Sequence, residues 1–337
     1  MHIYVAKTPP LLLRNNLHTI MKEYILGVDT SNYTTSLALI CHGKVIKNVR
    51  RLLPVESGKK GLRQSDAVFL HTKSLPELSR ELFCDFDVTA SKLCAVGVSV
   101  SPRDADGSYM PCFLSGISYA SAISDSLKIP LYRFSHQCGH IRSAIYSCGK
   151  PYDVFEHSPF ISFHVSGGTT EALITNKSQN GYSCKIAGGS NDASCGQIID
   201  RAGVMMGLDF PCGKELDALS LGSTKKLTKC VSIKDTYFSM SGLENKVQKF
   251  ISDGEEFSDI ARFIFESIAS SLEKCTMALR EKHGNLPAIY AGGVMGNSII
   301  RQKLSEMNDV YFASSELSSD NACGTALLAY DTFIRER

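Results

Sequence analysis

One pattern of strands occurs twice in the chain, and it limits the possible folds more than any other feature. In the first copy, the strand candidate Tyr24–Val28 runs into a polar loop. Two further candidates follow, Ser36–Ile40 and Val45–Ile46, separated by a turn at His42-Gly43. Short apolar runs bounded by such turns are typical of strands joined in hairpins.

The second copy lies more than a hundred residues downstream. Phe160–Val165 enters the loop 166–170, and Glu171–Thr175 and Tyr182–Ala187 follow around a turn that contains Gly181. Two copies of one arrangement predict two related lobes. The alternative is chance, because short hairpins recur in many mixed proteins.

Stretches with helical spacing follow each copy. They are Leu75–Leu82, Ile198–Met206 and the long Ile260–Leu279. A buried strand candidate, Ala288–Ala291, then ends at Gly292-Gly293. Strands that alternate with helices and end in glycine-rich loops indicate an α/β protein that binds its ligand at the loop ends.

Composition limits the class of protein. The 337 residues include 43% hydrophobic and 21% charged residues, and the net charge is +2. A protein that binds nucleic acid alone usually carries a basic stripe, so an RNA substrate would need partner proteins or a local groove. The twelve cysteines are scattered, which favours reduced thiols in a cytoplasmic protein. No segment predicts a signal peptide or a membrane span. We expect residues 1–22 to be an N-terminal extension without fixed structure, since Met21 stands where a natural start would be expected.

His136 and His140 form the sharpest local motif. A spacing of four places both imidazoles on one face of a helix, where they could share a metal. Asp320 is a candidate third ligand just before the expected helix Ala322–Tyr330. The plainer alternatives are two unrelated histidines and an aspartate that caps a helix.

Two glycine-rich loops could bring the backbone close to a ligand. Ser166-Gly167-Gly168 leaves one strand, and Gly292-Gly293 leaves another, with Asn297 in the first turn of the helix that follows. Their free N–H groups could hold a phosphate. Glycine pairs also end strands for steric reasons alone.

In this order and with these gaps, the motifs resemble the TsaD family, the tRNA N6-adenosine threonylcarbamoyltransferases once classed as glycoproteases. The resemblance covers about Tyr24 to Tyr330. The segments that carry it are Asp29-Thr30-Ser31, His136–His140, Val165–Gly168, the set Asp192, Gly196, Asp200, Pro211, Gly213 and Asp217, then Tyr237–Leu243, Ala291–Asn297 and Ser319-Asp320-Asn321. The older protease assignment finds little support, since Gln137 stands where HExxH requires glutamate.

The resemblance implies the two-lobed fold of actin, Hsp70 and sugar kinases (ASKHA), with duplicated RNase H-like lobes. Lobe I would comprise residues 23–130 and 318–337, lobe II residues 131–317, with the site in the cleft between them. It implies one divalent transition metal per chain, iron or zinc, on His136, His140 and Asp320. It also implies that an adenine nucleotide, threonylcarbamoyl-AMP, is held by Val165, Ser166, Gly167, Gly168, Asp200, Gly213, Asp217 and Asn297.

The implied activity is transfer of the threonylcarbamoyl group to N6 of the adenosine beside the anticodon. The implied partners are tRNA, a TsaB-like homologue and an ATPase of the family complex. Several family positions differ, however. Tyr33 and Thr34 replace two acidic residues, Thr169 replaces a histidine, and Ala193 and Gln197 replace further acids. Three hypotheses therefore stand: the family reaction, a divergent carbamoyl-type transferase with another acceptor, and a non-catalytic nucleotide-binding partner. No catalytic residue is assigned.

Overall fold

Hairpins and crossovers build two mixed sheets in the computed structural model, which describes residues 23–31, 33–54, 62–85, 92–149, 152–156, 159–179, 181–318 and 321–337. The first sheet has the order β3-β2-β1-β4-β5. Its strands are β1 (Tyr24–Asp29), β2 (Thr34–Cys41), β3 (Lys44–Leu52), β4 (Leu93–Ser101) and β5 (Leu131–Ser135). β1 pairs antiparallel with β2 and parallel with β4.

The second sheet repeats this order and adds a short hairpin at one edge. Its order is β12-β11-β6-β7-β8-β10-β9. The strands are β6 (Phe160–Val165), β7 (Thr170–Ser178), β8 (Gly181–Ser190), β9 (Ser232–Lys234), β10 (Tyr237–Ser239), β11 (Ala288–Ala291) and β12 (Val310–Phe312). In each sheet, the three strands of the repeated pattern lie side by side in reverse chain order. Two more strands extend the sheet beyond the first of the three and run parallel to it. The duplication predicted from the sequence is confirmed, and so is the two-lobed α/β fold.

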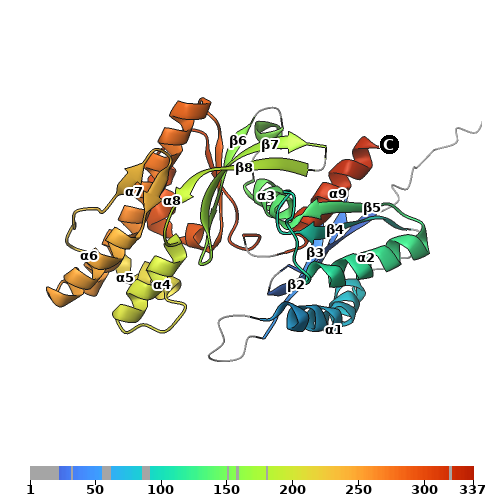
Figure 1. Cartoon of the computed structure of the whole chain (residues 1–337), viewed down its shortest axis with the longest axis horizontal. Coiled ribbons are helices and arrows are strands. Elements are labelled where there is room, and N and C mark those ends of the chain that lie inside the picture. The colour runs from blue at the N-terminus through green and yellow to red at the C-terminus, as the bar shows by residue number, and fades with distance from the viewer. Residues whose placement is uncertain are drawn as a thin grey trace, which may run out of the picture.

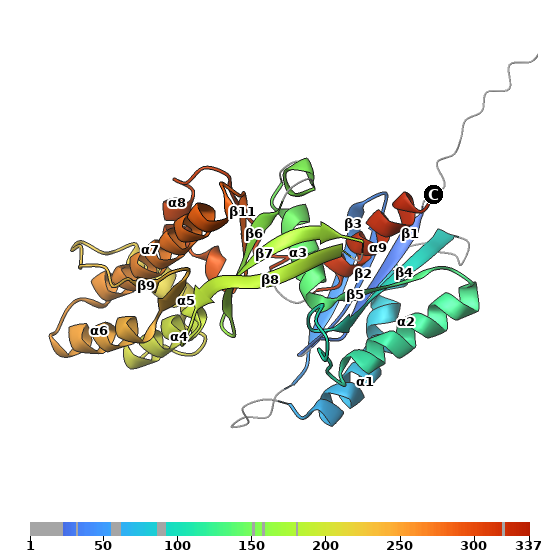
Figure 2. The same ribbon diagram turned by 45° about the horizontal axis from the view of Figure 1, so that its top comes forward.

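Helices cover both faces of the first sheet, which explains why β1 and β2 are buried along their whole length. α1 (Gln64–Phe83) and α2 (Phe113–Leu127) pack on one face. α9 (Cys323–Arg335) packs on the other, and α3 (His136–Ser147) packs against α9. Figures 1 and 2 show α3 and α9 between the two sheets.

Small residues allow these close contacts. A Cβ on Gly27 of β1 would lie 2.4 Å from the carbonyl oxygen of Ala322, so α9 lies directly on the strand. A Cβ on Gly324 would lie 1.7 Å from the carbonyl oxygen of Gly139, so α9 and α3 touch backbone to backbone. Any larger side chain at Gly324 would force the two helices apart.

The second sheet carries its own helices on the face away from α3. They are α4 (Cys195–Met205), α5 (Gly213–Ser220), α6 (Ser241–Ser252), α7 (Phe257–His283) and α8 (Ser298–Leu304), with a 3₁₀ turn at Gly293–Gly296. A second 3₁₀ turn, Tyr152–Phe155, contacts α3 instead. The apolar face predicted for the long helix is confirmed, because Ile260, Phe263, Ile264, Ile268 and Leu272 are all buried in the core of this lobe.

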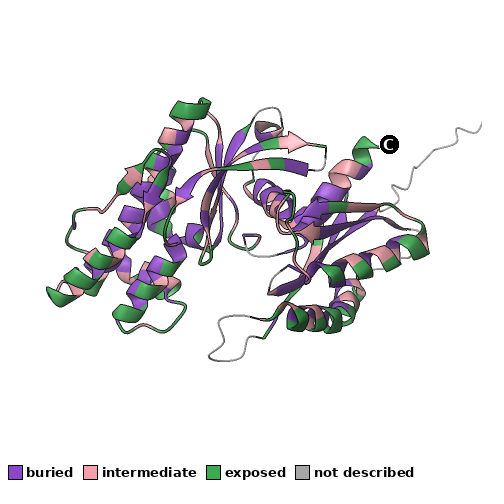
Figure 3. Ribbon diagram, in the orientation of Figure 1, coloured by how far each residue is buried: buried purple, intermediate pink, exposed green. Residues whose placement is uncertain are grey.

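A separate apolar cluster joins the lobes. It contains Ile25 of the first sheet, Ile289 of the second, and residues of α3 and α9 such as Ile141 and Leu328. Figure 3 shows buried residues running from one sheet to the other through these helices. Because β5 pairs with β4, residues 131–135 belong to the first sheet, and the lobe boundary expected at 130/131 falls inside it.

Two expectations concern residues that the structure does not describe. The expected extension 1–22 and the candidate ligand Asp320 lie outside the described residues. No helix in the described part of the chain is long and apolar enough to cross a bilayer.

Candidate functional site

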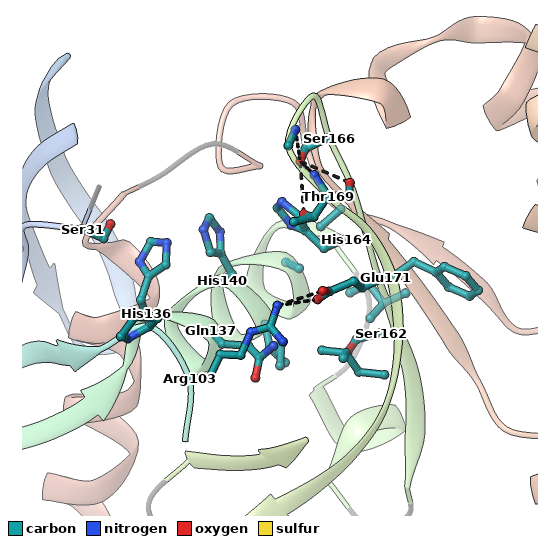
Figure 4. Close-up of a pocket in the computed structure, with 18 of the residues that line it drawn as sticks. Ser31, Arg103, His136, Gln137, His140, Ser162, His164, Ser166, Thr169 and Glu171 are labelled. Atoms are coloured by element: carbon teal, nitrogen blue, oxygen red, sulfur yellow. Dashed lines mark hydrogen bonds and ion pairs between the residues drawn. The ribbon is translucent and has the colours of Figure 1, made fainter. Parts of the chain in front are cut away.

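A cavity of about 490 Å³ lies between the two lobes. Figure 4 shows its polar side chains converging from both sides. Ser31 and Arg103 come from loops that follow β1 and β4, and His136, Gln137 and His140 come from α3. The second sheet and the loop after β6 contribute Ser162, His164, Ser166, Gly168, Thr169 and Glu171.

The two histidines of the predicted metal motif occupy the start of α3. Ser135 ends β5 and caps the helix, since its hydroxyl accepts a hydrogen bond from Cys138 N at 3.3 Å. His136 and His140 therefore stand one turn apart, with ring centroids 4.3 Å apart. They lie on one face of the helix, as the spacing predicted, and both line the cavity.

Asp29 fixes the orientation of one of these rings. Its buried carboxylate places Oδ2 2.7 Å from Nδ1 of His136, and the same oxygen accepts from the Ser99 hydroxyl at 2.9 Å. Oδ1 accepts from Ser31 N at 2.7 Å. An ionised carboxylate only accepts, so with Asp29 in that form the proton of this contact lies on Nδ1 of His136 and Nε2 is the nitrogen left for a ligand.

A third imidazole, from His164 on β6, was missed from the sequence. Its ring centroid lies 5.3 Å from that of His140. The signal was present, because β6 and its loop alternate apolar residues with the polar residues Ser162, His164 and Ser166, all of which line the cavity.

The donor set fits a metal only in part. His136 and His140 supply two nitrogen donors, but the described residues contain no group of three His, Cys, Asp or Glu side chains arranged to hold a metal ion. Asp320, the third ligand expected from the sequence, lies outside those residues.

The glycine-rich loop after β6 is held in a tight turn. Ser166 N donates to the Thr169 carbonyl at 2.8 Å, and the Ser166 hydroxyl accepts from Thr169 N at 3.1 Å. α4 packs against this loop. A Cβ on Gly196 would lie 2.6 Å from Gly167 Cα, and the Ser194 hydroxyl donates to the Gly167 carbonyl at 2.7 Å. Val165 lies beneath the loop with its side chain in the core.

A second cavity of about 580 Å³ opens on the other side of this loop. It is lined by Gly167, Gln197, Asp200, Arg201, Val204, Met205 and Phe210. Gly168 lines the first cavity and Gly167 the second, so the two cavities meet at adjacent residues of the loop. Asp200 also anchors the start of α5, since its Oδ1 accepts from Cys212 N at 3.0 Å.

The remaining predicted nucleotide residues meet at the α5–α8 contact. Gly213 begins α5. The Asn297 amide donates to Asp217 Oδ1 at 2.6 Å, and the Ser298 hydroxyl donates to the same oxygen at 3.1 Å. Asn297 precedes α8 and caps it through a 2.9 Å bond from Ile300 N, rather than lying within its first turn.

Asp192 ties two loops of the second lobe together. Its carboxylate accepts from Ser239 Oγ at 2.5 Å, Met240 N at 2.8 Å, Ser241 N at 3.0 Å and Ala193 N at 2.7 Å. Burial opposes ionisation, but these hydrogen bonds outweigh it and hold the pKa of the Asp192 carboxyl well below its ordinary value.

The loop after β1 meets the first cavity at Ser31, but the altered positions do not. Tyr33 and Thr34 line neither cavity. Thr34 begins β2 and is only 8% exposed, and the Tyr33 carbonyl accepts from Leu53 N at 2.7 Å. The side chain at position 34 therefore packs into the lobe.

Comparison with known proteins gives a consistent result. The family model described as "TsaD: tRNA N6-adenosine threonylcarbamoyltransferase" matches residues 57–327. A curated protein of that name from Prosthecochloris aestuarii is 30% identical over 330 residues, covering 90% of this chain and 92% of the relative.

Solved structures of lower identity support the fold. HypF of T. kodakarensis superposes with a TM-score of 0.58 at 13% identity, covering 94% of this chain and 48% of that one. Component A of (R)-2-hydroxyglutaryl-CoA dehydratase from Acidaminococcus fermentans superposes with a TM-score of 0.51 at 16% identity, covering 93% and 99%.

Proposed function

Because the chain belongs to the TsaD family, we propose that it transfers the threonylcarbamoyl group from threonylcarbamoyl-AMP to N6 of the adenosine next to the anticodon in tRNA. The observation that supports this most is the pair of cavities that meet at the loop 166–169. One is lined by imidazoles and the other by Asp200, and the adjacent loop residues Gly168 and Gly167 line one cavity each. A donor with a nucleotide at one end and a reactive carbonyl at the other has two such parts to accommodate.

In this proposal the nucleotide lies on the Asp200 side of the loop. The backbone N–H of Gly167 would donate to the phosphate, a common use of glycine-rich loops at strand ends, whereas Gly168 N donates within the turn to Ser166 Oγ at 3.3 Å. As the AMP leaves, the Gly167 donor would stabilise the charge that develops on it. Asp217 and Asn297, bonded to each other at 2.6 Å, would receive the ribose or base.

The carbonyl end lies beside the imidazoles. His136 and His140, with Asp320, would hold one iron or zinc ion. When bound, such an ion acts as a Lewis acid at a carbonyl oxygen. Asp29 orients His136 from behind, through its 2.7 Å contact with Nδ1.

tRNA binding requires help in this proposal. The net charge is only +2, whereas nucleic-acid affinity depends chiefly on contacts between cations and phosphates. A TsaB-like homologue and an ATPase of the family complex are the proposed partners.

The loss of acids at Tyr33 and Thr34 supports a second candidate, a carbamoyl-type transferase with another acceptor. Both candidates share the donor site and differ only in the acceptor.

The deciding experiment is formation of threonylcarbamoyladenosine by the purified chain. The reaction contains threonine, bicarbonate, ATP, tRNA, a known synthetase and the partner set, and the digested tRNA is analysed by mass spectrometry. The modified nucleoside should form only when threonine is present, and His140→Ala should abolish it. Donor binding without modified tRNA would contradict the first candidate and leave the second.

A further inference from the structure

An ion pair crosses the first cavity from one lobe to the other. Arg103 lies in the loop between β4 and α2, and Glu171 lies on β7. Arg103 Nη2 donates to Glu171 Oε1 at 2.8 Å and to Oε2 at 3.0 Å. Both side chains line the cavity, and Figure 4 shows the contact beside His140 and Gln137.

The backbone around Arg103 is fixed relative to the histidine helix. Arg103 N donates to Ser108 Oγ at 3.0 Å, and its carbonyl accepts from Ser101 Oγ at 3.0 Å. The carbonyl of the preceding Pro102 accepts from Gln137 N, in the first turn of α3, at 3.1 Å. The arginine and the two histidines are therefore held in one framework.

Glu171 is placed equally firmly. It stands directly opposite His164 in the β6–β7 register, and the two side chains face the cavity from neighbouring strands. Because Glu171 contacts only Nη2, it holds the guanidinium plane without covering its other donors.

Those other donors are uncommitted. Within the described residues, Nε and Nη1 of Arg103 make no hydrogen bond, and the side chain is 41% exposed at the cavity wall. A guanidinium presents five N–H donors in a planar fork that matches a carboxylate. The pair carries no net charge, so a ligand would be recognised by directed hydrogen bonds.

Resting on the proposed function, we propose that Arg103 binds the carboxylate of the amino-acid part of the transferred group, and that Glu171 is its positioning residue. Of the parts of threonylcarbamoyl-AMP, the amino-acid end carries the only carboxylate. When the nucleotide occupies the second cavity, on the Asp200 side of the loop, the amino-acid end lies in the first cavity, which Arg103 lines. Arg103 is then the residue that distinguishes an amino-acid donor from a simple carbamoyl donor.

The test uses two non-hydrolysable adenylates that differ in one group. The first carries the threonyl part, and the second carries the same part without its carboxylate, derived from 1-aminopropan-2-ol. Calorimetry measures both affinities for the parent, Arg103→Met, Arg103→Lys and Glu171→Gln. Arg262→Met is the matched control, since within the described residues that arginine pairs with Glu266, one turn away on α7 and outside both cavities.

We expect the parent and Arg262→Met to prefer the carboxylate ligand by about tenfold or more, the usual value of a hydrogen bond to a charged group. Arg103→Met should lose this preference while binding the second ligand as the parent does. Arg103→Lys should keep part of it, because lysine supplies charge without the fork. Glu171→Gln should reduce it.

Two results would overturn the inference. The first is an equal loss of affinity for both ligands in Arg103→Met, which would show that Arg103 acts on a part that the two ligands share, or, with a lowered melting temperature, that the pair only ties the lobes together. The second is an equal affinity of the parent protein for the two ligands, with both bound more tightly than AMP. A parent that binds neither better than AMP would instead contradict the proposed function itself.

Discussion

The carboxylate of Asp29 lies 2.7 Å from Nδ1 of His136, although the two residues are 107 positions apart in the chain. A buried acid behind a histidine sets which nitrogen faces a ligand. The relationship connects the end of β1 to the start of α3, and so links the first lobe's sheet to the proposed metal ligands.

Asp29→Asn should weaken metal binding by about 10–100-fold, the usual effect of losing such a carboxylate. Zinc affinity measured against a competing chelator checks this. Asp85→Asn, which removes an exposed carboxylate, is the control, and His136→Ala should remove binding altogether. Equal zinc affinity in parent and Asp29→Asn would show that Asp29 only packs.

Asp217→Ala should weaken AMP binding roughly tenfold, because a charge-assisted hydrogen bond contributes about 1.5–3 kcal/mol. Asn297→Ala should act in the same direction. Since the two side chains are bonded at 2.6 Å, the double variant should bind little worse than either single variant. Calorimetry of the three variants gives the coupling, and additive losses would speak against a shared role.

Restoring acids in the loop after β1 should have different effects at the two positions. Thr34 is 8% exposed at the start of β2, so Thr34→Glu buries a charge and should lower the melting temperature. Tyr33→Asp should fold normally. If a lost carboxylate limits the rate, Tyr33→Asp should raise tRNA modification by about 10²-fold or more, the lower end of acid–base help. An unchanged rate would show that position 33 supplies no such help.

Stability should fall in acid through Asp192. The folded pKa of its carboxyl is depressed by hydrogen bonds, so the unfolded chain binds a proton first as pH drops. Its contribution is complete above the ordinary aspartate pKa, about 4, and is lost as pH falls toward the lower folded value. Urea midpoints at pH 7 and pH 3.5 should differ less for Asp192→Asn than for the parent. An identical pH dependence would refute the assignment.

Gly324→Ala should destabilise the protein by about 1–3 kcal/mol, as overpacked helix contacts do. The added Cβ would meet the Gly139 carbonyl at 1.7 Å. Gly296→Ala is the control, since a Cβ there meets nothing within 4 Å. Thermal unfolding of both variants compares them directly.

The sequence predicted the repeated hairpin pattern because hairpins are local and their turns are visible as glycine-containing segments. It predicted the buried face of α7 because that face follows from helical spacing alone. It placed the boundary before β5 wrongly for a physical reason. Leu131–Ser135 is a short strand whose sheet is decided by pairing with β4, a contact that no local pattern encodes.

The site was predictable where one motif carried it and hidden where two distant residues share a role. His136 and His140 stand one turn apart and were recognised from spacing. Arg103 and Glu171 are 68 positions apart, and in the sequence neither can be distinguished from an ordinary charged surface residue. His164 was overlooked because a single histidine in an apolar strand is usually a core or surface residue.

The imidazole pair stands on α3, whereas the glycine-rich loop belongs to the second sheet. Neither lobe alone therefore fixes the gap between the carbonyl proposed to lie at the histidines and the phosphate proposed to lie at the loop. The effective molarity of the reacting groups then depends on how α3 and α9 pack between the two sheets. A shift of about 1 Å in such geometry can lower the rate about 10²-fold. Substitutions buried in that shared core, far from any ligand, would alter turnover while leaving nucleotide affinity intact.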